Sequence, residues 1–466
     1  MGYNFRLTTH ANPALHYLMP DSSLLQLSIT GNLAPQAPAP IPQLGTGQRT
    51  MTVDANTLQQ LSTKNRMWGN ASYRNGVTYN VTWNETAHYD RLRPYVMGDG
   101  RGGDMHFEQY ELNGGYAWQH RRMMGGITLG YCALSQYRSR DPRPNNTVSS
   151  LRANAGLACK ITGKLALGIS LHGEKYKQIN ELIYMNELGA QKEFHLTGLG
   201  NDFTRFSGTS NRAFYTGAAF GGSIDMSPVT DTGLSATIAY DLTYTKKILT
   251  DLNRIPINSL KITKVTTEVA WKHPSFGIKL QGDYSQRKGK DNMFGDAIGN
   301  VYLQIGAREQ YTEDACTAHL TAFYESQAQN RWSWGIMPKI SIDMLKAQHH
   351  DSGNEAKATQ LSCALKGQGT WQVKRNRLHS SLMLMQRKNL HHELHLHQVA
   401  TPELQQVLQD GDNYRAHDVT SVNWQLGYDR AILNGKVISL QLGWNHMLYL
   451  ANSHSNEYEL KITFTL

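Results

Sequence analysis

The chain has no long hydrophobic run. No stretch of its 466 residues approaches the roughly 18 consecutive apolar residues of a membrane-spanning helix, which excludes a helical membrane protein. Hydrophobic residues make up 40% of the chain, and its mean hydropathy is −0.49. A membrane β-barrel has such values as readily as a soluble protein does, because every second residue of a barrel strand is polar.

Cysteine is scarce and scattered. No two of the four cysteines form a C-x-x-C pair, so the sequence indicates neither a zinc knuckle nor a dithiol redox site. No secretory leader precedes Met1, although the envelope location argued below requires one. We expect that the sequence was trimmed or begins at an internal methionine.

Basic residues outnumber acidic ones without forming a patch. Lys and Arg number 46 against 37 Asp and Glu, a net charge of +9, and they are spread along the chain without interleaved aromatic residues. This pattern argues against nucleic acid as a partner. It fits lumen and loop residues that face phosphate groups. We therefore expect membrane lipids and lipopolysaccharide as partners.

The last eleven residues, 456–466, alternate without exception. One face of an extended strand carries only apolar side chains: Tyr458, Leu460, Ile462, Phe464 and Leu466. The other face carries Glu457, Glu459, Lys461, Thr463 and Thr465. The length suits a tilted membrane-crossing strand of roughly 9–11 residues. An apolar stripe on a free sheet edge would invite strand addition, so the pattern predicts the closing strand of a barrel.

Similar alternation recurs along the chain and predicts an all-β, transmembrane antiparallel up-and-down barrel of about 18 strands. An even number of strands is usual for bacterial barrels. The strands are expected near 22–31, 66–75, 77–84, 105–119, 122–138, 146–161, 164–178, 211–226, 232–247, 259–272, 274–287, 313–325, 330–346, 356–373, 376–389, 416–431, 435–450 and 455–466. Asn75-Gly76 is a tight hairpin signal between the second and third of these. Residues 22–466 form the barrel, and residues 1–21, with Pro13, form a periplasmic lead-in or plug.

The connections alternate between short and long, which predicts short periplasmic turns and long extracellular loops, with both termini in the periplasm. The short set is Asn75-Gly76, Thr162-Gly163, His273-Pro274, Lys374-Arg-Asn376 and Leu433-Asn-Gly435. The long set is 32–65, 85–104, 179–210, 248–258, 288–312, 347–355 and 390–414.

Two family resemblances follow from short motifs. Asn12-Pro-Ala14 resembles the N-terminal motif of the long-chain fatty-acid transporters, outer-membrane barrels that are plugged by an N-terminal segment and pass hydrophobic compounds. Most of the chain resembles an uncharacterised family of Bacteroidota outer-membrane barrels, a domain of unknown function. The stretches that carry this resemblance are Pro94-Tyr-Val96, Asp141-Pro-Arg-Pro144, Tyr176-Lys-Gln178 and Leu196-Thr-Gly-Leu-Gly200. The second resemblance implies the fold, the outer membrane and a TonB-dependent receptor or lipoprotein as partner.

One histidine-rich stretch is a candidate metal site. In an extended chain, His391, Glu393, His395 and His397 share a face, and two imidazoles with a carboxylate can bind a transition metal. By loop parity, His349 and His350 lie at the same mouth of the barrel, as does His454. The pattern raises the hypothesis of a transition-metal or haem site at the extracellular rim. The alternative is a polar loop that is rich in histidine.

Other motifs carry less chemistry. The stretch Gly98-Asp-Gly-Arg-Gly-Gly-Asp104 lacks the Lys-Ser/Thr ending of a phosphate loop, so it is a flexible loop or a loop folded into the lumen. Ser439 and His446 face opposite sides of their predicted strand and form no nucleophile–base pair. We therefore expect no enzymatic activity.

The predicted function is passage or capture of a small molecule, such as a nutrient, a hydrophobic compound, iron or haem. An alternative is a non-conducting accessory or scaffold barrel that binds another envelope protein. A third class, a soluble all-β carbohydrate-binding or enzyme domain, would lack an apolar outer belt.

Overall fold

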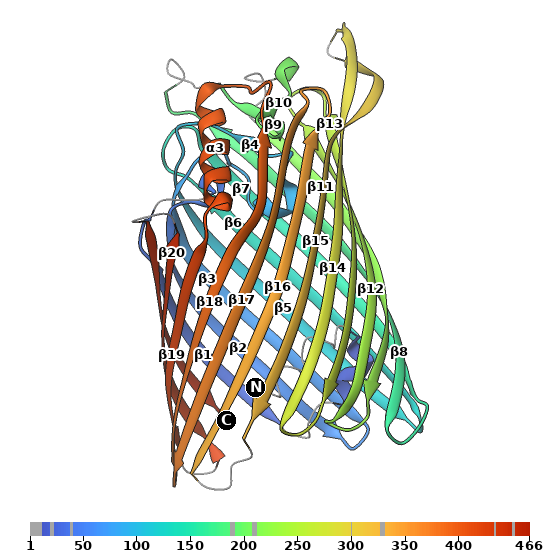
Figure 1. Ribbon diagram of the computed structural model, residues 1–466. Coiled ribbons are helices and arrows are strands. Elements are labelled where there is room, and N and C mark those ends of the chain that lie inside the picture. The colour runs from blue at the N-terminus through green and yellow to red at the C-terminus, as the bar shows by residue number, and fades with distance from the viewer. Residues whose placement is uncertain are drawn as a thin grey trace.

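The computed structural model describes residues 12–18, 23–37, 41–186, 192–206, 212–299, 301–326, 331–432, 435–449 and 453–466, and these form a closed barrel (Figure 1). In this part of the chain, 18 strands form one sheet, in which each strand pairs antiparallel with the next barrel strand and β21 pairs back to β1. The fold class is therefore confirmed. Closure leaves no sheet edge, so every strand finds its backbone partners without water.

The barrel strands are longer than the crossing of a bilayer requires, and several extend beyond it. Their bounds are β1 Leu24–Ala34, β2 Gly47–Ser62, β3 Asn65–Val81, β5 Gly103–His120, β6 Met123–Tyr137, β7 Arg143–Lys160, β8 Leu165–Ile183, β11 Arg212–Pro228, β12 Gly233–Leu249, β13 Ile255–Lys272, β14 Phe276–Ile298, β15 Val301–Glu325, β16 Trp332–His349, β17 Asn354–Val373, β18 Asn376–His395, β19 Val419–Ala431, β20 Val437–Tyr449 and β21 His454–Thr465.

The outer face is apolar and the inner face is polar, as the alternation predicts. On β8, Leu171 points outward and is 72% exposed, whereas Ser170 and Gln178 point inward and are 4% and 0% exposed. On β12, Ile238 is 61% exposed and faces out. An exposed apolar belt of this extent is stable only against hydrocarbon, so the barrel spans a membrane.

The C-terminal strand closes the ring as expected. β21 pairs with β1 in the register Leu27↔Phe464 and Leu33↔Tyr458. Leu25 and Leu466 complete the seam with two backbone hydrogen bonds of 3.3 and 2.8 Å. Phe464 is 46% exposed on the outer face, and its neighbour Thr463 is buried on the inner face.

The start of β1 and the end of β21 lie at one end of the barrel, here called the termini end (Figure 1). Short turns at this end include the predicted ones at residues 161–164, 273–275 and 374–375. Residues 433 and 434 of the predicted Leu433–Gly435 turn lie outside the described residues. The opposite end, here called the long-loop end, carries the remaining connections, so the predicted alternation of turns and loops holds.

The smaller elements lie at the two ends or inside the barrel. They are η1 Pro13–Leu18, η2 Pro42–Leu44, α2 Tyr89–Leu92, β4 Met97–Gly98, β9 Phe194–Gly198, β10 Asn201–Asp202, η4 Thr204–Phe206 and α3 Pro402–Ala416. β4, β9 and β10 form a separate three-stranded sheet. No helix among the described residues is long and apolar enough to cross a membrane.

The predicted hairpin at Asn75-Gly76 is wrong, because β3 continues straight through both residues. Neither has the positive φ that a tight hairpin turn needs. Gly76 instead allows close packing, since a Cβ there would lie 2.4 Å from the carbonyl oxygen of Arg49. The prediction of a long loop at residues 32–65 is also wrong, because this stretch contains β2, whose Thr50 faces the lumen. The two errors offset each other, so the strand count of 18 stands.

Two predicted long loops are shorter than expected. The prediction of a loop at residues 288–312 is wrong, because β14 and β15 continue as a paired hairpin as far as Ile298 and Val301. In the 390–414 loop, β18 continues to His395 and the helix α3 follows. These extensions lie beyond the membrane, where one face no longer has to be apolar. Backbone pairing therefore continues without the alternation that marks the membrane strands.

Candidate functional site

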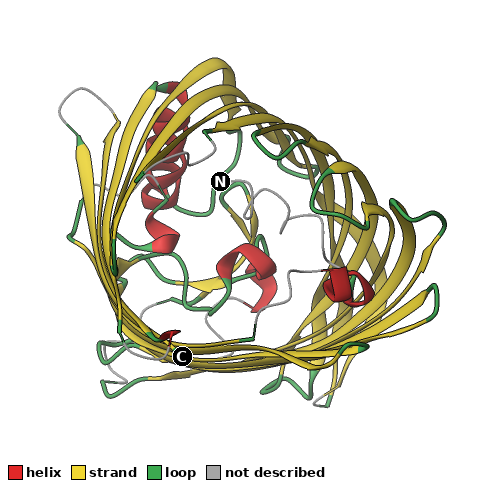
Figure 2. Ribbon diagram, turned by 90° about the horizontal axis from the view of Figure 1, so that it is seen from below, coloured by secondary structure: helices red, strands yellow, loops and turns green. Residues whose placement is uncertain are grey.

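Two segments fold into the lumen at the long-loop end. The first inner segment, residues 82–102, carries α2 and β4, and the second inner segment, residues 192–206, carries β9, β10 and η4. Figure 2 shows such elements inside the ring of strands. The two segments are joined by the pairs Met97↔His195 and Gly98↔Phe194. Their buried side chains pack with inward-facing wall residues into one apolar cluster, which includes Trp83, Leu92, Val96, Met97, Phe194, Leu196, Phe206, Tyr176, Tyr215, Leu249 and Ile257.

Arg138, which follows β6 in the wall, holds the first inner segment by two carboxylates. Its Nη2 donates to Glu85 at 3.0 Å and to Asp99 at 2.7 Å, and all three side chains are at most 1% exposed. The other Asp99 oxygen accepts the backbone N–H groups of Arg101 and Gly102 at 2.8 Å. The glycine-rich stretch is therefore a loop folded into the lumen, the second of the two predicted alternatives. Removing one partner of such a buried cluster leaves a charge without compensation.

A pair of carboxyl groups joins the two inner segments. Glu85 and Glu193 are 0% and 1% exposed, and a proton on one carboxyl group lets it donate a hydrogen bond to the other. Burial raises the pKa of Glu193 to about 7. Burial also raises the pKa of Glu85 well above its ordinary value, and the Glu193 carboxyl raises it further. The contact between the segments therefore contains a proton that is lost near neutral pH.

Further wall residues bind the backbone of the first inner segment. The side chains of Asn146 and Asn180 donate to the carbonyl oxygen of Glu85 at 2.8 and 2.6 Å. Lys247 on β12 donates to the carbonyl oxygen of Val96 at 3.1 Å and is 1% exposed. Asn146 and Asn180 lie on the adjacent strands β7 and β8, and Lys247 lies on β12, two strands further around the ring, so the segment is fixed to this part of the wall.

At the termini end, residues 12–18 lie against the inner wall. Asn12 is buried and donates to Asp225 on β11 at 3.1 Å. A Cβ at Gly126 would lie 2.4 Å from the Pro13 carbonyl carbon, so the close approach of η1 to β6 requires glycine there. His16 stacks on Trp68 with ring centroids 4.3 Å apart.

A cavity of about 680 Å³ lies in the lumen between Arg91 of α2 and Trp68 of β3, the ring on which His16 of η1 stacks. Most of its lining residues are polar or charged, and their apolar atoms supply much of the exposed surface. Glu174 on β8 accepts from Arg91 at 2.6 Å and from Arg152 at 3.2 Å. Nearby, His172 lies 2.7 Å from an Asp241 oxygen. A cavity of this size with a few convergent charged groups suits a small polar ligand.

A second cavity, of about 570 Å³, lies on the other side of α2. It is lined by Arg91 and His88 of the first inner segment and by Arg74 and Gln109 of the wall. Burial lowers the pKa of His88, so this imidazole is neutral at pH 7. Because Arg91 lines both cavities, a ligand that moves from one to the other passes this side chain.

The structure brings part of the predicted histidine site together. His391 and His395 on β18 lie 3.5 and 3.9 Å from the carboxylate of Glu393. Glu393 is also paired with Lys357 at 3.2 Å. His397 lies after the strand, where its backbone N–H donates to Asn354 at 2.8 Å.

The second predicted group of histidines is separate. His349 is buried and turned inward, with Nε2 3.4 Å from the Thr197 hydroxyl, whereas His350 is exposed and lies 3.4 Å from the Thr312 hydroxyl. Within the described ranges, no three His, Cys, Asp or Glu side chains are arranged to hold a metal ion. The metal or haem site at the rim stays a prediction.

Titration of the refolded barrel with zinc or haem tests this site. If His391, His395 and Glu393 form it, zinc or haem binds at micromolar concentration, and the double variant His391→Ala/His395→Ala lowers affinity by about 10-fold or more. Isothermal titration calorimetry measures both values. The matched control is His120→Ala, at the termini end of β5. Wild-type protein that binds neither zinc nor haem at micromolar concentration would rule the site out.

The sequence interpretation did not single out Arg138, Glu85, Glu193, Glu174 or Arg91. Glu174 carries a detectable signal, since a charged residue on the inward face of a regular strand must meet a partner in the lumen. Glu85 and Glu193 lie in segments without periodicity. Their contact depends on how two loops fold between non-adjacent strands, so no local pattern could have indicated it.

Comparison with known sequences identifies one family. The sequence family described as "Family of unknown function (DUF6850)" matches residues 13–466. No curated protein sequence matches the chain. The Bacteroidota source and the likeness to long-chain fatty-acid transporters stay predictions.

Solved structures with a similar barrel include outer-membrane proteins. BauA, the ferric preacinetobactin receptor from Acinetobacter baumannii, aligns with a TM-score of 0.46 at 10% identity, over 96% of this chain and 80% of that one. The outer membrane transporter YddB from Escherichia coli aligns with a TM-score of 0.40 at 7% identity, over 95% and 81%. The CymD monoaromatic hydrocarbon channel aligns with a TM-score of 0.34 at 10% identity, over 98% and 91%. Similarity of this extent carries no argument about what this chain binds or transports.

Proposed function

The chain belongs to this family of unknown function, and we propose that it captures a small polar molecule and passes it across the outer membrane. The observation that carries the proposal is the cavity of about 680 Å³ with charged groups that lies between the first inner segment and the wall. A scaffold barrel needs no such space. The lumen of a scaffold is better filled with paired or apolar side chains, because a charged cavity stabilises nothing by itself.

The proposal places the barrel in the outer membrane of a Gram-negative bacterium. The apolar outer belt and the closed even-numbered sheet support this location. The termini end faces the periplasm, and the long-loop end faces the exterior. The ligand therefore enters past the two inner segments, which must move to admit it. The proposed N-terminal plug is residues 1–21, of which 1–11 and 19–21 lie outside the described residues, and the contacts of residues 12–18 with the inner wall support it.

The ligand class is a small molecule that carries a carboxylate or phosphate group. Arg91 and Arg152 both point to Glu174, so two guanidinium groups share one carboxylate. The Arg152 side chain is 64% exposed to the cavity and can bind an anionic group without leaving Glu174. The charges of Glu174 and Asp241 disfavour a ligand with many negative charges.

Liposome flux tests the proposal. We expect wild-type barrels to admit small anionic solutes faster than neutral solutes of the same size. The variant Arg152→Gln should lower the uptake of anions by about 5- to 10-fold, because one charge-assisted hydrogen bond is lost. Liposome swelling measures uptake, and Arg331→Gln, at an exposed turn, is the matched control. Liposomes that show no solute-dependent flux would favour the alternative, a non-conducting scaffold with a TonB-dependent receptor or lipoprotein as its partner.

A further inference from the structure

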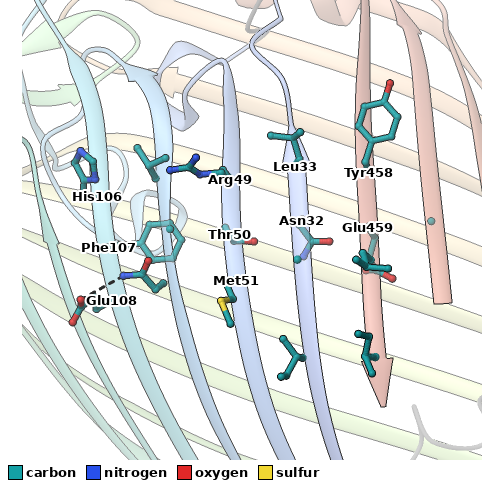
Figure 3. Close-up of a pocket in the computed structure, with 18 of the residues that line it drawn as sticks. Asn32, Leu33, Arg49, Thr50, Met51, His106, Phe107, Glu108, Tyr458 and Glu459 are labelled. Carbon is teal, nitrogen blue, oxygen red and sulfur yellow. Dashed lines mark hydrogen bonds between the residues drawn. The ribbon is translucent and has the colours of Figure 1, made fainter. Parts of the chain in front are cut away.

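The outer wall carries a groove of about 830 Å³ at the seam between the last and first strands. It crosses β21, β1, β2, β3 and β5 (Figure 3). The groove lies on the membrane side of the wall, because Leu33 and Met51 in its lining are 43% and 53% exposed and point away from the lumen. The lumen cavities described above are therefore not part of it.

The groove exists because glycine, which has no side chain, occupies position 31 on the outer face of β1. Gly31 on β1 lies in register between Leu460 of β21 and Met51 of β2. An added Cβ at Gly31 would find no heavy atom within 4 Å. The next outward residues of the same strand, Ile29 and Leu33, are large and exposed. The wall is thus hollow at one position with bulky neighbours on all four sides.

The groove has a polar end and an apolar end. Leu33, Arg49, Val77 and His106 are consecutive partners across four strands, and this row lies nearer the long-loop end than Gly31 does. In Figure 3, Arg49 extends from β2 toward His106 on β5. In the row of Gly31 itself, Leu460 and Leu442 lie side by side on β21 and β20, and toward the termini end Ile29 is paired to Ile462, so this part of the lining is aliphatic.

Arg49 supplies an available positive charge at the polar end. It is exposed, and no ion pair joins it to another residue that the structure describes. The other polar groups have partners in the wall. Glu108 accepts from Asn75 at 3.4 Å, and His106 stacks on Tyr137 with ring centroids 5.4 Å apart. An anionic group at this level would therefore meet the guanidinium of Arg49 first.

We propose that this groove seats one molecule of an acylated, phosphorylated glycolipid of the external leaflet, the lipid A part of lipopolysaccharide. An acyl chain fills the hollow at Gly31 and lies along Ile29, Leu460 and Ile462. A phosphate oxygen accepts from Arg49. The inference rests on the outer-membrane location proposed above, which puts this anionic lipid beside the long-loop end.

The affinity comes mainly from the phosphate. Lipid tails are as apolar as the groove, so transfer of an acyl chain from bilayer to wall adds packing but little hydrophobic free energy. A guanidinium forms two parallel hydrogen bonds with a phosphate, and a basic residue near the membrane surface favours an anionic headgroup by roughly fivefold in affinity. The hollow then selects a lipid with a chain directly beside its phosphate.

Native mass spectrometry of the detergent-purified full chain tests the inference with lipid A added. We expect one bound lipid A per wild-type barrel. Arg49→Gln should lower the apparent affinity by about fivefold. Gly31→Phe places a ring in the hollow, from a Cβ that meets no heavy atom within 4 Å, and should abolish the bound species. Arg121→Gln, at an exposed turn of the termini end, is the matched control and should bind as wild type. The heat-modifiable gel mobility of each variant confirms that it is folded.

The possible results distinguish lipid A from other membrane lipids as the occupant of the groove. Folded Gly31→Phe and Arg49→Gln barrels that bind lipid A as wild type does would overturn the inference. Phosphatidylglycerol that binds as tightly as lipid A would overturn the assignment to the glycolipid, and the neutral-headgroup phosphatidylethanolamine should bind weakest. Solute flux in liposomes reports on the lumen instead. Loss of lipid in Gly31→Phe with unchanged flux supports the groove, and absence of flux in every variant rejects the proposed transport but leaves the lipid result intact.

Discussion

Replacement of Arg138 by alanine should open the long-loop end of the barrel. Arg138 is the shared partner of Glu85 and Asp99, and all three side chains are buried. The variant leaves two carboxyl groups in a site without their cation, which costs about 3–5 kcal/mol for a buried pair. Loops open locally at a lower free-energy cost than global unfolding, so a loss of this size should release the first inner segment, residues 82–102, from its packed position.

Single-channel conductance in planar bilayers measures this opening. We expect Arg138→Ala barrels to show a conductance several-fold higher than wild type, while the thermal unfolding of the strands changes little. Arg140→Ala is the matched control, because Arg140 is exposed two residues further along. The triple variant Glu85→Gln/Asp99→Asn/Arg138→Met removes all three charges and should restore a low conductance. Equal conductance in wild type and Arg138→Ala would show that the inner segment does not depend on this cluster.

The second large effect is a rise in conductance with pH. Glu193 keeps its proton in the packed state up to about pH 7, because burial raises its pKa from the ordinary value of 4.5. Between these two values the released segment has lost the proton and the packed segment retains it. Packing is therefore fully stabilised below pH 4.5 and weakens by roughly 1.4 kcal/mol per pH unit until about pH 7.

The groups around Glu193 set how strong this effect is. The charged and titratable side chains that face it or its partner carboxyl are Glu85, Asp99, Arg138, Lys247, Tyr184 and Tyr215. Asp99 repels the ionised form of Glu193, whereas a hydrogen bond from Glu85 and the charges of Lys247 and Arg138 favour it. Burial outweighs these contributions, so ionisation of Glu193 opposes the contact between the two inner segments.

Conductance recorded from pH 4.5 to pH 8 checks this expectation. Wild-type barrels should conduct little at the acidic end and several-fold more at pH 8. Glu193→Gln removes this ionisation, so its conductance should rise less between pH 4.5 and pH 8 than that of wild type, whereas Glu181→Gln, on the wall at the end of β8, should titrate as wild type. A wild-type conductance that falls with rising pH would reverse the assigned role of Glu193.

The architecture could be predicted from the sequence because every second side chain of a membrane strand contacts lipid and is therefore apolar. Tyr458, Ile462 and Phe464 face hydrocarbon in the structure as the alternation indicates. Where that constraint is weak, the interpretation fails. Asn75-Gly76 reads as a turn by local propensity, yet the pairing of β3 with β2 and β5 keeps both residues extended. The extensions of β14, β15 and β18 lie outside the apolar belt and carry no alternating signal.

The sequence alone determined that this chain is a barrel with short turns at one end and long connections at the other, because contact with lipid imposes a period of two on each strand. Tertiary structure alone decided what occupies the lumen. The contacts of Arg138 with Glu85 and of Asn12 with Asp225 join residues far apart in the chain. Such contacts depend on which strands the closure of the barrel brings face to face. A local sequence pattern contains no information about contacts between residues so far apart in the chain.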